Sequence, residues 1–276
     1  VIINILLDFK WVLGYWGSEP MGIQGAAFAS VAAETVFVII IGAYALFSPS
    51  FRHYDLRRFT ILTRSRIESI INISSPIVLQ NLLSMISWFM FFVLIEKMGE
   101  RELAISNLVR AVYMVLMTPI WGYASAANSM VSNIIGQDRY QDVRKLVIRI
   151  IQLCLATTMT ITLADYLAGP FLLDLTSGDP DLIRDAYGSY NVIVVAMVVF
   201  SISVVLLSTV SGSGNTKAAM FIEFINIAIY ILYVYFCSVN NTSIEVIWFA
   251  EILYWVLMGT LSLLYFKLFK WKDIKI

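Results

Sequence analysis

Two polar side chains near the start of the chain are the clearest candidates for chemistry. Asn4 and Asp8 are spaced i and i+4, so both lie on one face if residues 1–10 are helical. An amide carbonyl beside a carboxylate could hold a sodium ion, or Asp8 could carry a proton. A carboxylate that ends a helix near water could instead be a simple cap. The spacing alone leaves both interpretations open.

Three other carboxyl groups lie inside long apolar stretches, at Glu34, Glu223 and Glu251. Ionisable groups at membrane depth are costly, so each is first treated as functional. Each could bind and release a proton during transport, or it could be hydrogen-bonded to a neighbouring helix. We favour the packing interpretation for Glu34 and leave the other two open.

Polar and aromatic residues form a stripe on one further apolar stretch. Gln80, Ser84 and Trp88 are spaced i, i+4 and i+8, and Asn81 lies beside them. The stripe suits the wall of a cavity for amphipathic organic molecules, or hydrogen bonding between helices. The next apolar stretch adds Arg110 as a further candidate for the same wall.

Seven apolar stretches must position these side chains. A bilayer core of about 30 Å takes about 20 residues of helix. The chain is 59% hydrophobic and 14% charged, whereas a soluble domain is about a quarter charged. We therefore predict an all-α polytopic membrane protein with seven full transmembrane helices and the end of an eighth. The predicted spans are residues 22–47, 70–97, 107–135, 143–167, 186–210, 218–237 and 244–269.

The longest polar connection suggests a division into two lobes. We predict that residues 1–48 hold the end of one helix and one full helix, and that residues 49–69 form a cytoplasmic linker. Residues 70–276 would then form a six-helix C-terminal lobe, a natural half of a transporter. Because the chain starts with Val1 inside an apolar run, we expect it to be part of a larger transporter.

The charges orient the chain and exclude some functions. Loops on one face hold 14 of the 19 basic residues, so that face and the C-terminus are expected to be cytoplasmic. The net charge is zero and gives no reason to expect a nucleic-acid partner. His53 is the single histidine, which excludes a histidine cluster for catalysis or metal binding, and Cys154 and Cys237 are expected to be free thiols.

Several motifs, taken in order, resemble the multidrug and toxic compound extrusion (MATE) family. Asn4 and Asp8, a short loop, and then residues 22–30 resemble the junction of that family's fifth and sixth helices. Residues 212–217 resemble its loop between the tenth and eleventh helices. Residues 75–76, and Gly136 followed by Arg144, also fit. The resemblance covers essentially the whole chain.

This resemblance implies the end of helix five, helix six and the C-terminal lobe of a twelve-helix antiporter. Such a protein would export cationic amphipathic compounds in exchange for Na⁺ or H⁺, without another cofactor and without enzymatic activity. Its cation site would fall on Asn4 and Asp8, with a small-residue pair at Ala26 and Ser30. We expect a monomer in the bacterial inner (plasma) membrane, in contact with lipid and small cationic substrates.

The chain departs from the family pattern at two positions. Ser84 stands where some members carry a glutamate, and the chain is apolar around Ile202, where they carry an aspartate. A cation site of that type is therefore not expected in the C-terminal lobe. One alternative is a lipid-linked oligosaccharide flippase, for which Arg110 is the basic candidate inside the cavity. The other is an integral-membrane transferase, for which Asp165 is the lone acid.

Overall fold

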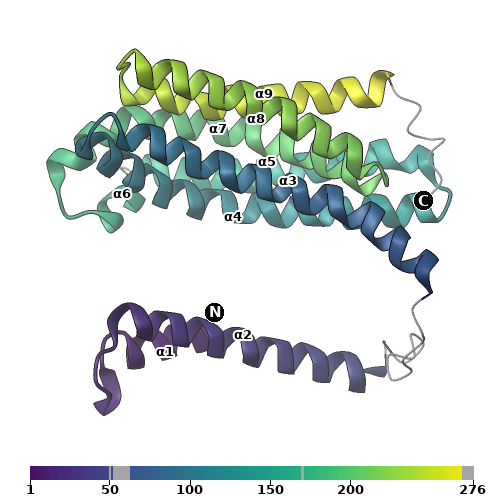
Figure 1. The fold of residues 1–276 in the computed structure, drawn as a ribbon, viewed down its shortest axis with the longest axis horizontal. Helices are drawn as coiled ribbons and strands as arrows, with labels where there is room; N and C mark the ends of the chain where they lie inside the picture. The colour runs from purple at the N-terminus through teal and green to yellow at the C-terminus, as the bar shows by residue number, and fades with distance from the viewer. Residues whose placement is uncertain (50, 52–62, 169–170, 269–276) are drawn as a thin grey trace. The chain divides into compact units, whose positions relative to one another are not determined.

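The computed structural model describes residues 1–49, 51, 63–168 and 171–268, and these residues contain helices and no strand. Two short helices, α1 (Ile2–Trp11) and α6 (Phe171–Thr176), and a 3₁₀ turn, η1 (Tyr15–Gly17), accompany the long ones (Figure 1). Seven helices are long and apolar enough to cross a membrane: α2 (Gly22–Phe47), α3 (Arg64–Glu96), α4 (Glu100–Gly136), α5 (Tyr140–Leu167), α7 (Pro180–Gly212), α8 (Thr216–Val239) and α9 (Ile244–Leu268). The predicted all-α membrane fold with seven full spans is confirmed.

Several helices are longer than the apolar stretches that predicted them. Residues 64–69 of the expected linker belong to α3, and α4 and α7 each begin about two turns before the predicted span. The added turns are polar: Glu100 and Glu102 lie in the first turn of α4, and Asp179 caps α7. Apolar patterning therefore marked the membrane-embedded part of each helix and missed its polar ends. Residues 52–62, with His53, and 269–276 lie outside the described residues.

The first of two compact units spans Val1–Arg64 and contains α1 and α2. These helices pack against each other, and the Met21 amide donates a hydrogen bond to the Trp11 carbonyl at 2.8 Å. Gly25 lies against that same carbonyl, so closely that a Cβ atom at this position would overlap it. The close approach of α1 to α2 therefore depends on a glycine at position 25.

The second unit, Ser65–Ile276, is a helical bundle centred on α7. This helix packs most extensively against α9 and α4 (Figure 1). Small residues allow both contacts: a Cβ atom on Gly212 would lie 2.6 Å from the Asn128 carbonyl oxygen, and one on Gly259 would lie 2.5 Å from the Ser203 hydroxyl. Close packing through small residues is the usual way in which membrane helices associate.

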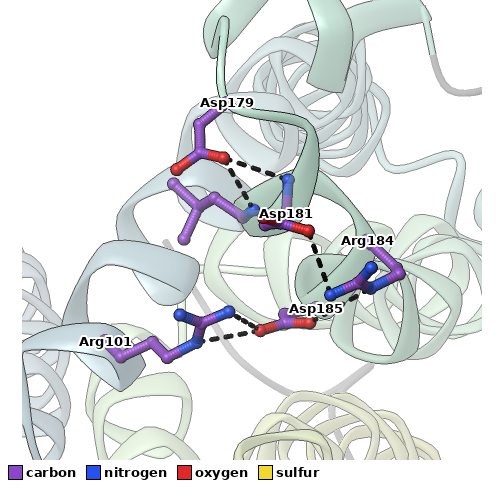
Figure 2. Close-up of polar contacts among 6 residues, drawn as sticks. Arg101, Asp179, Asp181, Arg184 and Asp185 are labelled. Atoms are coloured by element: carbon purple, nitrogen blue, oxygen red, sulfur yellow. Dashed lines mark hydrogen bonds and ion pairs between the residues drawn. The ribbon is translucent and has the colours of Figure 1, made fainter.

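Polar side chains connect the first turns of α4 and α7 (Figure 2). The Arg101 guanidinium donates to Asp185 Oδ2, with the Nε contact at 2.9 Å. Asp179 accepts from the backbone amide of Asp181 at 3.0 Å, and Arg184 pairs with Asp181 at 3.1 Å. Only the Arg101–Asp185 pair joins the two helices, and because Arg101 is largely exposed it contributes little to stability.

Candidate functional site

A cavity of about 600 Å³ lies among α3, α4, α7, α8 and α9 in the second unit. Two carboxyl residues, Glu223 and Glu251, line it, and no lysine, arginine or histidine lines it among the described residues. The remaining wall combines aromatic rings with uncharged polar groups, including Gln80, Asn81, Ser84, Trp88, Tyr113, Trp121, Asn128, Tyr230, Tyr254 and Trp255. The cavity can therefore accept a molecule with flat apolar parts and a positive charge.

The structure places the predicted stripe of α3 on this cavity. Gln80, Asn81, Ser84 and Trp88 all belong to its lining. The Trp88 ring stacks on Tyr113 of α4, with centroids 5.7 Å apart, which fixes its orientation. Arg110 is not in the lining, and its guanidinium lies over the Phe92 ring, 4.8 Å from the centroid.

Glu251 on α9 is buried and holds three helices together. Its Oε2 accepts a hydrogen bond of 2.8 Å from the Tyr113 hydroxyl, and its Oε1 accepts one of 3.0 Å from the Tyr230 hydroxyl. The Tyr113 oxygen in turn accepts from the Trp255 indole N–H at 2.9 Å. Both carboxyl oxygens of Glu251 thus have a donor, as buried polar groups require.

Glu223 on α8 is buried, and only one of its two carboxyl oxygens accepts hydrogen bonds from the described residues. Its Oε1 accepts hydrogen bonds from the hydroxyls of Ser84 on α3 and Tyr254 on α9. Its Oε2 has no hydrogen-bond partner within the described chain, and neither amide atom of buried Asn226 has one. The Tyr230 and Tyr254 rings pack edge to face, with their centroids 5.4 Å apart. Because Tyr230 donates to Glu251 and Tyr254 donates to Glu223, this ring pair connects the two carboxyl groups.

Sequence reasoning did not identify Tyr230 and Tyr254, although their spacing carried a signal. Tyr230 follows Glu223 by seven residues on α8, and Tyr254 follows Glu251 by three on α9. Both intervals place the tyrosine on the same helix face as the carboxyl group. Each tyrosine then donates to the carboxyl group of the other helix.

The candidate cation residues of the first unit lie on both of its helices. Asn4 and Asp8 are half-buried on α1, whereas on α2 Ala26 is half-buried and Ser30 is exposed. No hydrogen bond or ion pair joins these four side chains within the described residues. Na⁺ or H⁺ binding at Asn4 and Asp8 therefore stays a prediction. Glu34 is exposed on α2 without a hydrogen-bond partner in the described chain, which gives the packing interpretation no support.

Asp165, the lone acid considered for a transferase, has a structural role. It is buried at the end of α5, where its Oδ2 accepts from the Tyr190 hydroxyl at 2.6 Å. Its Oδ1 accepts from the Leu172 amide at 3.1 Å, which fixes the first turn of α6. Both oxygens are engaged in holding α5, α6 and α7 together.

Comparison with known families agrees with this architecture. Residues 76–236 match the model of the MatE family, which is more than half of the chain. The chain belongs to the MatE family. The matched region begins at Pro76 in α3 and ends within α8, so it contains the cavity wall formed by α3, α4 and α7.

Individual MATE relatives are distant in sequence and close in fold. The chain is 24% identical over 273 residues to the probable multidrug resistance protein NorM of Thermotoga maritima, covering 98% of this chain and 58% of that protein. A crystal structure of MATE in complex with MaL6 superposes with a TM-score of 0.80 at 18% identity, covering 96% of this chain and 59% of the other. A MOP superfamily transporter from Pyrococcus furiosus gives a TM-score of 0.78 at 20% identity, with 96% and 58% covered. The chain therefore spans less than two thirds of the length of these relatives.

Proposed function

We propose that the protein exports cationic amphipathic compounds by secondary active transport, in exchange for Na⁺ or H⁺. The observation that carries this proposal is the composition of the cavity wall. Its aromatic rings attract cations and pack against flat apolar groups. Its carboxyl residues, Glu223 and Glu251, supply negative charge without an opposing basic residue in the lining.

Transport in the intact protein would use the alternating access that is general among such transporters. Substrate binds in the cavity of the second unit, and rocking of one lobe against the other exposes it to each side in turn. The exchanged ion drives this cycle only by binding one state more tightly than the other. We assign one coupling site to Asn4 and Asp8, beside Ala26 and Ser30.

The cavity disfavours the lipid-linked oligosaccharide flippase. A pyrophosphate group needs basic side chains, and Arg110, the single basic candidate of the sequence, lies over Phe92 and outside the lining. The relative from Pyrococcus furiosus is described as having a binding pocket of reverse polarity that suggests a different function. Pocket polarity is therefore the property by which we choose between the two substrate classes.

The test is the accumulation of a cationic fluorescent dye in efflux-deficient cells that express the intact protein. We expect lower accumulation than in vector controls. This difference should disappear when one of the two gradients, that of sodium or that of protons, is collapsed. Trp88→Ala, in the cavity wall, should raise accumulation toward the vector level. Phe224→Ala, on the exposed face of α8, is the matched control and should export normally. Unchanged accumulation of every cationic dye would contradict the proposal.

A further inference from the structure

We propose that the exposed face of α5 binds the headgroup of an anionic phospholipid at the end of the bundle where this helix begins. An open groove of about 430 Å³ lies there, apart from the substrate cavity, to whose lining α5 contributes no described residue. Intervals of three and four residues place its lining on one helix face. The lining consists of Gln141, Arg144, Lys145, Ile148, Arg149 and Gln152, all of them exposed.

The three cations of this groove lack a counter-charge. The side chains of Arg144, Lys145 and Arg149 form no ion pair or hydrogen bond within the described part of the chain. The acidic residue in the first turn of α5, Asp142, pairs with Arg139 instead, at 2.7 Å. Like charges spaced i and i+4, such as Lys145 and Arg149, repel each other on a helix surface. A bound anion would remove this repulsion.

The length of α5 brings the groove to the level of lipid phosphates. Its 28 residues extend for about 42 Å. A bilayer with both headgroup layers has a similar thickness, about 40–45 Å. The first turns of the helix therefore lie among headgroups and not in the hydrocarbon. Arginine donates paired hydrogen bonds to phosphate and lysine adds a point charge, so this set of side chains suits a phosphodiester.

Beyond Gln152 the same face of α5 becomes apolar. Met159 and Leu163 follow Gln152 by seven and eleven residues, so they share its face, and both are exposed. From Gln152 to Leu163 the helix rises about 16 Å, close to the hydrocarbon depth of one leaflet, about 15 Å. A soluble anion would use only the basic part of this face, whereas a phospholipid matches both parts. The face therefore favours a lipid.

The charge of the groove selects among phospholipids. A zwitterionic lipid carries its own cation beside the phosphate, whereas phosphatidylglycerol keeps a net negative charge. Three cations without a counter-charge should therefore prefer the anionic lipid. Basic groups at membrane helix ends are a general means of recognising such headgroups. The inference is independent of the proposed function, since it concerns a different surface of the protein.

The test is native mass spectrometry of the purified intact protein with phosphatidylglycerol or phosphatidylcholine of the same acyl chains. We expect one phosphatidylglycerol molecule to bind more tightly than phosphatidylcholine. Arg144→Gln with Arg149→Gln should weaken its binding about 30-fold, because each basic residue near a lipid surface contributes about a fivefold factor in affinity. The matched control is Lys217→Gln with Lys267→Gln, which removes the same charge from exposed positions on α8 and α9 and should leave binding unchanged.

Two further measurements separate the lipid site from simpler explanations. Arg144→Lys with Arg149→Lys keeps the charge and should retain most of the preference for phosphatidylglycerol. Inorganic phosphate should not displace the bound lipid. Equal binding of the two lipids, an equal loss in the control variant, a lysine variant as weak as the glutamine variant, or displacement by inorganic phosphate would each overturn the inference.

Discussion

Removal of single tyrosine hydroxyls around Glu251 should destabilise the bundle in a defined order. Tyr113→Phe deletes two hydrogen bonds, one donated to Glu251 and one accepted from Trp255. Tyr230→Phe deletes only the bond donated to the other oxygen of Glu251. Both substitutions keep the aromatic ring, so packing changes little and the hydrogen bonds dominate the difference.

The expected loss of stability follows from the number of hydrogen bonds between helices that each substitution deletes. In membrane proteins such a bond contributes about 0.6 kcal/mol and at most about 1.7 kcal/mol. Tyr230→Phe should therefore lower the free energy of unfolding by roughly 0.6 to 1.7 kcal/mol, and Tyr113→Phe by roughly 1 to 3 kcal/mol, about twice as much. The buried indole N–H of Trp255 would also lose its acceptor, which favours the upper part of the second range.

Unfolding of the purified intact protein in mixed micelles, titrated with SDS, measures this order. Tyr235→Phe is the matched control, because this tyrosine is 56% exposed on α8 and should tolerate the change. If Tyr230→Phe destabilised the protein as much as Tyr113→Phe, or more, the assignment of two hydrogen bonds to Tyr113 and one to Tyr230 would be contradicted.

Further substitutions test the packing, the thiols and the first unit. Gly212→Ala should destabilise the bundle by about 1–3 kcal/mol in the same unfolding assay, because the new methyl group meets the α4 backbone. Gly122→Ala, which meets nothing within 4 Å, should not, and equal effects would contradict the packing of α4 on α7. Cys154 and Cys237 are free and buried, so a polar maleimide should label them only after denaturation, and rapid labelling of folded protein would contradict their burial. Asp8→Asn should reduce ion-driven dye export, and export that remained fully dependent on the same gradient would remove Asp8 from the coupling mechanism.

The transmembrane fold was predictable from sequence because membrane helices must satisfy their own backbone hydrogen bonds over a long apolar stretch. Helix ends were less predictable, since the first turns of α4 and α7 are polar and continue beyond the apolar pattern. Helix α6 was not predicted at all. It has six residues, and its first turn is held by a side chain of another helix, Asp165, so its own sequence does not determine it.

The site was only partly predictable, because periodicity identifies one face of a helix and does not show which residues of other helices pack against that face. The spacing of Gln80, Ser84 and Trp88 placed them on one wall, and the structure puts that wall on the cavity. Nothing in the spacing of Arg110 showed that it would lie against Phe92. The roles of Glu223 and Glu251 depend on hydroxyl groups from other helices, which a single helix does not reveal.

Ser84 shows that a residue which departs from the family pattern can still contact a carboxyl group of another helix. This residue stands where some MATE members carry a glutamate, and its identity argued against a carboxylate site in this lobe. In the structure its hydroxyl donates to Glu223, so a carboxyl group reaches the same part of the cavity from α8. The chemistry of the wall is set by the helices that meet there and not by one position alone.

The charge preference of the cavity is the central claim, and a pair of ions matched in size and shape tests it most directly. Tetraphenylphosphonium and tetraphenylborate differ mainly in the sign of their charge. We predict that the purified intact protein binds tetraphenylphosphonium saturably, that Trp88→Ala weakens this binding, and that tetraphenylborate does not compete. Equal or tighter binding of tetraphenylborate would contradict the account, since the described residues that line the cavity include two carboxyl residues and no basic residue.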